Sequence, residues 1–176
     1  DLSLLPDFKE HLHRNAHKNY KRALREKFIV EKTDISRAYA VIAANRQSKG
    51  YNLAMSLTDV ETTATVIDID AFTLRHDNTD VAAAIVYRIA PGIAHVVYWG
   101  DIPGFEHLRP MNILPYHVFS HYHNLGYRIV NIGTSSTDGI PNHGLCDFKS
   151  SLGCTLSLIP TITIHNSCCA SAKAMT

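Results

Sequence analysis

Hydrophobic and polar residues alternate along this chain with two periods, one typical of helices and one typical of strands. Apolar side chains recur every three or four positions over residues 6–27, which predicts a leading helix opened by Pro6 and Asp7. Helical spacing with start or stop signals also covers residues 34–50, 58–67, 111–125 and 142–153. Short apolar runs bounded by turn residues predict strands at residues 28–30, 72–76, 81–89, 94–99, 129–132 and 156–164.

This order of elements favours a mixed α+β fold. Behind the leading helix it runs strand, helix, helix, three strands, helix, strand, helix and strand, so that the three central strands form a meander. The chain has 176 residues, of which 45% are hydrophobic and 19% charged, which suits one globular domain. The net charge of +1 indicates no particular partner.

No run approaches the roughly 18 apolar residues that span a membrane, and we expect a cytoplasmic protein. The chain begins with Asp1 rather than Met, which predicts a piece of a longer polypeptide. Four cysteines contain no C-x-x-C pair, so reduced thiols are expected rather than disulfides or a zinc site. They are Cys146, Cys154, Cys168 and Cys169.

The segment from Arg128 to Cys154 holds the clearest candidate site. A short apolar strand leads into a hydroxyl-rich turn over residues 133–139, and a helix capped by Asn142 follows, with Lys149 near its end. A strand that delivers hydroxyls and backbone amides to the start of a helix forms a polar pocket suited to an anion or a carbonyl.

The spacing within this segment resembles that of the GNAT acyltransferases. Within that superfamily it is similar to the Fem-type transferases that build peptidoglycan cross-bridges and to the FemAB-like acetyltransferases. Many GNAT domains have on their fourth helix an Asn, an apolar residue three positions on, an aromatic pair at six and seven, and Gly-Phe at eleven and twelve. The matching residues are Asn142, Leu145, Phe148, Lys149, Gly153 and Cys154. Lys149 replaces the tyrosine that often protonates the leaving thiolate, and Fem-type proteins also carry Phe-Lys there.

The resemblance implies a GNAT fold, with a mixed, mostly antiparallel central sheet flanked by helices. That domain would cover residues 28–165, between an extra basic helix at residues 1–27 and a polar tail at residues 166–176. It also implies that the strands at 94–99 and 129–133 diverge, so that the pantetheine arm of coenzyme A lies between them like an added strand.

The resemblance also implies where the donor binds. Backbone amides near Tyr98, Trp99 and Gly100 would hold the thioester oxygen, and Thr134 with Asn142 would line the pocket.

Donor phosphates would lie at the start of the helix over residues 111–125, near Arg109 and Asn112, with Asn112 as its cap. Most GNAT enzymes have a Gly-rich loop there, whereas residues 106–112 read EHLRPMN. Fem-type transferases, which accept aminoacyl-tRNA, also lack that loop.

For catalysis we expect Lys149 to stabilise developing charge, beside Ser135 and Asp138 of the hydroxyl-rich turn. The amine attacks the donor directly in a ternary complex, so no covalent enzyme intermediate is needed. The candidate general bases are side chains of loops flanking the expected cleft, and their ranking stays open: Asp101, Glu106, His107, Asp138 and His143.

The leading hypothesis is therefore an N-acyltransferase that uses acyl-CoA and an amine acceptor. Two alternatives remain: an aminoacyl-tRNA-dependent Fem-type transferase acting on a cell-wall precursor, and a non-catalytic GNAT-fold binding module. His117 and His121 have metal-ligand spacing without an adjacent Glu, and we predict no metal. The leading helix has a basic face that is either solvated or a candidate for tRNA phosphates. That face consists of Arg14, Lys18, Lys21, Arg22 and Arg25.

Overall fold

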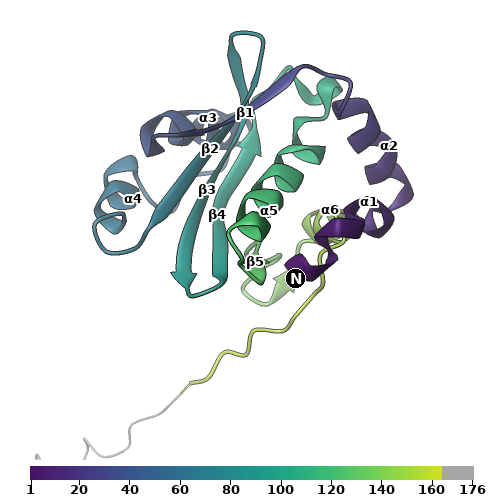
Figure 1. Cartoon of the computed structure of the whole chain (residues 1–176). Helices are drawn as coiled ribbons and strands as arrows, with labels where there is room; N and C mark the ends of the chain where they lie inside the picture. Colours follow the sequence, from purple (N-terminus) through teal and green to yellow (C-terminus); the bar gives the residue numbers. More distant parts are fainter. Residues whose placement is uncertain (164–176) are drawn as a thin grey trace, which may run out of the picture.

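A five-stranded sheet forms the centre of the computed structural model, which describes residues 1–163. Its strands stand in chain order, with β1 to β4 antiparallel and β5 parallel to β4 (Figure 1). The strands are β1 (Phe28–Thr33), β2 (Ile69–His76), β3 (Thr79–Ala90), β4 (Ile93–Asp101) and β5 (Ile129–Asn131). This arrangement confirms the predicted α+β fold with a mostly antiparallel sheet.

Helices cover both faces of this sheet. One face carries α3 (Ile35–Ser48) and α4 (Leu57–Thr63), and the other carries α5 (Leu114–Asn124) (Figure 1). The remaining helical elements are η1 (Leu2–Asp7), α1 (Phe8–His11), α2 (Arg14–Ala23), η2 (Glu106–Leu108), η3 (Pro110–Asn112) and α6 (His143–Ser151). A two-stranded hairpin, β6 (Ser136–Thr137) with β7 (Ile140–Pro141), precedes α6.

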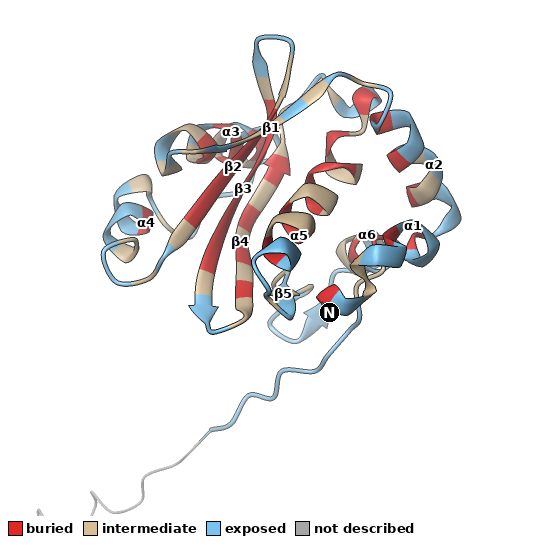
Figure 2. Ribbon diagram, viewed as in Figure 1, coloured by how far each residue is buried: buried red, intermediate tan, exposed pale blue. Residues whose placement is uncertain are grey.

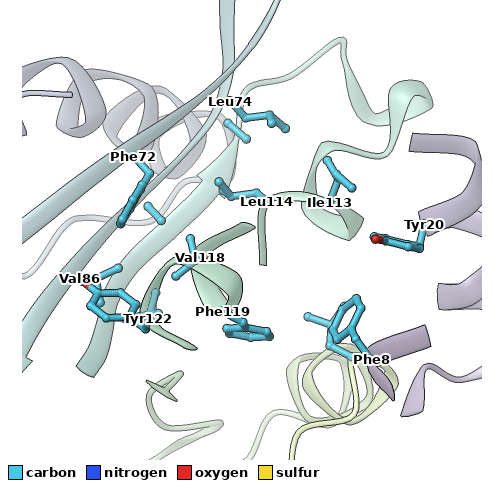
Figure 3. Packing of buried hydrophobic residues seen from close by; sticks show 14 of the residues in the cluster. Phe8, Tyr20, Phe72, Leu74, Val86, Ile113, Leu114, Val118, Phe119 and Tyr122 are labelled. Atoms are coloured by element: carbon cyan, nitrogen blue, oxygen red, sulfur yellow. The ribbon is translucent and has the colours of Figure 1, made fainter. Parts of the chain in front are cut away.

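The larger core lies between the sheet and α5, and the N-terminal helices extend it (Figure 2). Phe8 of α1 packs its ring edge-on against Tyr20 of α2, with the ring centroids 5.5 Å apart. Phe8 also lies 6.4 Å from the ring of Phe119 on α5, and all three side chains are buried (Figure 3). The leading helical segment is therefore held by the same apolar core as the sheet.

A buried carboxylate joins α5 to the sheet. Asp70 of β2 is 2% exposed and accepts two hydrogen bonds from Arg88, at 2.7 and 3.0 Å, and one from the Tyr122 hydroxyl at 2.8 Å. Lys32 also pairs with it. Burial opposes ionisation of Asp70, but these donors outweigh it and hold the pKa of the carboxyl below its ordinary value.

The prediction of one continuous helix over residues 6–27 was wrong. The chain is extended at Leu12, with ψ 134, and α2 starts afresh at Arg14. The amide of His13 donates to the carbonyl of Ser151 in α6 at 3.0 Å, so a contact distant in sequence replaces a helical hydrogen bond. Helical periodicity alone does not report such a contact.

The predicted last strand, residues 156–164, is also absent from its described part, residues 156–163. Leu158 is 92% exposed and Ile162 is 79% exposed. An alternating pattern shows that a segment can form a strand, but a strand also requires a partner edge, and within the described chain this segment has none. Residue 164 and the predicted tail, residues 166–176, lie outside the described residues.

Candidate active site

A cleft opens between β4 and β5. The two strands pair over three positions, from Ile93 with Ile129 to His95 with Asn131. β5 then ends while β4 continues to Asp101, so the outer edge of β4 faces no strand of the described chain over residues 96–101. The cleft has a volume of about 320 Å³ and receives side chains from both strands and from α6. This confirms the expected gap between the two segments.

Gly133 turns the chain away from β4. Its φ of +75 lies in the left-handed region, which glycine adopts without steric cost. Its amide donates to the side-chain oxygen of Asn131 at 2.8 Å, which closes a tight turn directly after β5. The divergence of the strands is therefore encoded by a local turn.

Lys149 of α6 fixes this turn from the other side. Its ammonium donates to the carbonyl oxygens of Gly133, at 2.8 Å, and Thr134, at 2.7 Å. The residue is 7% exposed and lines the cleft. Burial lowers the pKa of Lys149, and its third N–H has no protein acceptor among the described residues.

His95 is a residue of the cleft that the sequence analysis did not single out. It stands on β4 at the last position paired with β5, and it lines the cleft. Its Nδ1 is buried without a hydrogen-bond partner, and burial, together with the nearby charge of Lys149, lowers the pKa of the imidazole. A neutral imidazole near pH 7 can accept a proton, which the guanidinium of Arg46, also in the lining, cannot.

A bulge in β4 sets the direction of Trp99. Tyr98 pairs with Ile85 but Val96 pairs with Val86, which leaves Val97 as an extra residue. A bulge re-aims the side chains beyond it, and Trp99 lines the cleft with its ring edge-on to Phe148 of α6, centroids 6.1 Å apart.

Of the predicted donor-binding residues, some line the cleft and others lie on the opposite side of the sheet. Trp99 and Thr134 line the cleft. Tyr98 is turned toward the α3 and α4 side, where its hydroxyl accepts from the amide of Met55 at 3.2 Å. Gly100 lies against Asn45 of α3, whose side chain donates to the carbonyl of Asp101.

Groups of the hydroxyl-rich turn form hydrogen bonds that stabilise the turn and the start of α6. The carbonyl of Ser135 accepts from the amide of Asn142 at 2.8 Å, and the Asn142 side chain caps α6 by accepting from the Leu145 amide at 3.0 Å. Asp138 has φ +49 and lies exposed at the tip of the hairpin β6–β7. The structure brings Lys149, Trp99 and Thr134 together and places Ser135, Asp138 and Asn142 outside the lining of the cleft.

The start of α5 differs from the phosphate site that the resemblance implied. Residues 106–112 form two 3-10 turns, in which the amides of Arg109 and Asn112 are already donors to backbone carbonyls. α5 begins at Leu114 without a side-chain cap, so the expectation that Asn112 caps it was wrong. Leu114 and Pro115 are buried in this first turn. The backbone amides of the two residues expected to meet the donor phosphates are therefore already engaged within the protein.

None of the five candidate bases lines the cleft. Glu106 accepts from the amide of Gly104 at 2.9 Å, and His107, Asp138 and His143 are exposed. Asp101, at the end of β4, has a pKa raised by burial. Their roles remain predictions, and His95 has the more direct access to the cleft.

Two of the four cysteines lie on or just after α6. Cys146 and Cys154 are free thiols, and burial raises the pKa of Cys154 to about 11, which keeps it protonated at neutral pH. Cys168 and Cys169 lie outside the described residues. Over residues 1–163 no three His, Cys, Asp or Glu side chains are grouped to hold a metal ion.

No family model matches the chain, and no curated protein matches it significantly. Solved structures do match it. FemX covers 85% of this chain with a TM-score of 0.71 at 10% identity, and the chain spans 56% of FemX. The ribosomal-protein-S18-alanine N-acetyltransferase from Escherichia coli has a TM-score of 0.56 at 12% identity, over 72% of this chain and 76% of that one.

A third match is the aminoglycoside antibiotic 6′-N-acetyltransferase from Acinetobacter baumannii. Its TM-score is 0.57 at 10% identity, over 79% of this chain and 98% of that one. These similarities show the fold, and the chain has the GNAT fold. None of its helices within residues 1–163 has the length and apolar character needed to cross a bilayer.

Proposed function

We propose that this protein is an N-acyltransferase that moves an acyl group from a thioester donor such as acyl-CoA to an amine. The observation that carries the proposal is the cleft of about 320 Å³, where an unpaired strand edge, an imidazole and an ammonium face one space. The GNAT fold, shared with proteins named as N-acetyltransferases, supports it.

The donor's extended arm would lie along β4. The backbone N–H and C=O groups that point away from β3 between Val96 and Trp99 have no strand beside them, so an extended chain can pair with them as an added strand. Val97, Trp99 and Leu145 supply apolar walls. Backbone amides near Trp99 would stabilise the oxyanion that forms at the thioester carbonyl.

In the chemical step, the amine nitrogen attacks the thioester carbon to give a tetrahedral intermediate. The C–S bond then breaks, and the thiolate leaves with its electron pair. His95 would take the proton that the amine loses, directly or through one water, and we favour it over Asp138 because it lines the cleft. Lys149 would hold the turn in place and give a proton to the departing thiolate.

A second candidate function is transfer from an aminoacyl-tRNA onto a cell-wall precursor. Two observations favour it: the engaged backbone amides of Arg109 and Asn112 before α5, and the similarity to FemX over 85% of the chain. In this case the same cleft would hold an ester instead of a thioester. A GNAT-fold module that binds without catalysis is the third candidate.

A thermal-shift comparison of acetyl-CoA with acetyl-pantetheine tests the donor. Saturation at about 100 times the dissociation constant should stabilise the fold by about 2.7 kcal/mol. Because the amides of Arg109 and Asn112 are engaged in 3-10 turns, we expect the diphosphate to add little, so that the two ligands stabilise the protein about equally. No shift with either at millimolar concentration would overturn the acyl-CoA proposal and leave the tRNA-dependent and binding-module candidates.

The variant His95→Gln separates donor binding, measured by thermal shift, from the chemical step, measured by release of the thiol. It should keep the donor-induced shift but slow release of the thiol in the presence of amine about 100-fold or more. Exposed His123→Gln, on α5 and outside the lining of the cleft, is the matched control and should change neither measurement. Undiminished thiol release by His95→Gln would remove His95 from the mechanism.

A further inference from the structure

The outer face of α2 is a concave, strongly basic surface, which we call the α2 groove. The groove has a volume of about 480 Å³. Its lining residues are Arg14, His17, Lys18, Lys21, Arg22 and Arg25. These positions recur every three or four residues, so they lie on one side of the helix. Residues 11–25 contain no Asp or Glu, and none of the described ion pairs involves these six side chains.

The opposite face of α2 is committed to the core. Ala16, Tyr20 and Ala23 are 4%, 2% and 1% exposed, and the Tyr20 ring packs against Phe8 (Figure 3). A basic amphipathic helix that binds membranes inserts its apolar face into the lipid. Because that face is packed against the core here, α2 presents its cations to solvent and has no apolar face left to insert into lipid.

We propose that the α2 groove binds the phosphate backbone of a nucleic acid. A helix of ten residues is about 15 Å long at 1.5 Å per residue, which matches roughly four phosphates of one strand. Arginine binds phosphate through two parallel hydrogen bonds, and lysine neutralises it as a point charge. The proposal does not rest on acyl transfer, since none of the six side chains lines the cleft between β4 and β5.

Fluorescence anisotropy with short labelled duplexes tests the proposal. The full chain is titrated into duplex RNA and, separately, duplex DNA over a series of KCl concentrations. Release of about 0.9 counterion per phosphate from four phosphates gives an expected slope of about −3 to −4 for log K against log [KCl]. Equal affinity for the two duplexes supports backbone recognition alone, and preference for RNA supports added contacts to the 2′-hydroxyls.

A pair of variants with the same loss of charge makes the test specific. Lys18→Ala/Lys21→Ala should weaken binding at least tenfold and make the slope shallower by about two. Lys49→Ala/Arg128→Ala removes two exposed cations from other elements and should leave the slope unchanged.

Three results would overturn the proposal. One is the absence of binding to either duplex at about 50 mM salt. Another is an equal loss of affinity in both double variants, which would assign binding to overall charge. The third is binding to vesicles with anionic lipid but to neither duplex, which would make the groove a membrane contact.

Discussion

Lys149 is a charged side chain whose partners are backbone carbonyls. Its ammonium donates to Gly133 and Thr134, the two residues that carry the chain out of β5. Hydrogen bonds from charged donors contribute about 1.5–3 kcal/mol each, more than neutral ones. Lys149 therefore holds the wall of the cleft in place, whatever further part it has in transfer.

The variant Lys149→Met tests this anchoring. Methionine keeps the apolar stem but removes both hydrogen bonds, so the free energy of unfolding should fall by about 2–3 kcal/mol. The thioester-dependent release of thiol should fall with it. Urea unfolding measures the first effect, and Lys49→Met, at an exposed position, should stay within about 0.5 kcal/mol of the parent chain. Full stability in Lys149→Met would show that the two bonds do not fix the turn.

The sequence identified Lys149 but missed His95, for a physical reason. Lys149 follows Asn142 at a spacing that is visible along one helix. His95 lines the cleft because β5 stops pairing with β4 at this position, where His95 is opposite Asn131 of the other strand. Alternation shows which strand positions share a face, but it does not report where a neighbouring strand ends. Chemistry that depends on strand divergence therefore appears only in the folded chain.

Among the elements, β4 and α3 approach each other so closely at Gly100 that a side chain there would collide with α3. A Cβ at Gly100 would lie 2.7 Å from the Asn45 side chain, which is 2% exposed. This close approach explains why a glycine occupies position 100, next to the last residue of β4. Gly100 faces α3 and is not part of the lining of the cleft.

The variant Gly100→Ala should therefore be destabilised. Overpacking of this kind costs about 1–3 kcal/mol in the free energy of unfolding. The double variant Gly100→Ala/Asn45→Ala should lose less than the sum of the single variants, with a coupling of about 1 kcal/mol or more. Urea unfolding of the four chains gives the cycle.

Gly144→Ala is the matched control for this cycle. Its Cβ would meet only Asn142 Oδ1, at 3.7 Å, and a helical alanine should be neutral or stabilising by up to about 1 kcal/mol. Additivity of Gly100→Ala and Asn45→Ala would contradict the close contact.

Element boundaries followed the sequence where local signals set them. Asp34 caps α3 by accepting from the Arg37 amide at 2.8 Å, at the first residue of the helical range 34–50 that the sequence predicted. The break at Leu12–His13 and the unpaired segment 156–163 were not predicted, because both depend on what the rest of the fold offers. Local chemistry sets caps and turns, while strand partners and helix breaks depend on tertiary contacts.

At the scale of the whole molecule, burial of histidines links stability to pH. Burial lowers the pKa of three histidines. One is on β4, His95, and two are on α5, His117 and His121. The folded chain therefore resists protonation at positions where the unfolded chain takes up a proton near pH 6.5. Because the unfolded state then binds more protons, the free energy of unfolding must fall as pH decreases through that value.

We predict a loss of stability on the order of 1 kcal/mol between about pH 7 and about pH 5, after allowance for solvent screening. Urea unfolding at a series of pH values measures it. Protonation of Asp70, whose pKa is lowered, removes further stability only below about pH 4, so the two effects separate. His117→Gln should flatten the dependence between pH 7 and pH 5, and His123→Gln, at an exposed position of the same helix, should not. If both variants keep the slope of the parent chain, burial of His117 is not its source, and the acid sensitivity belongs to the remaining ionisable groups.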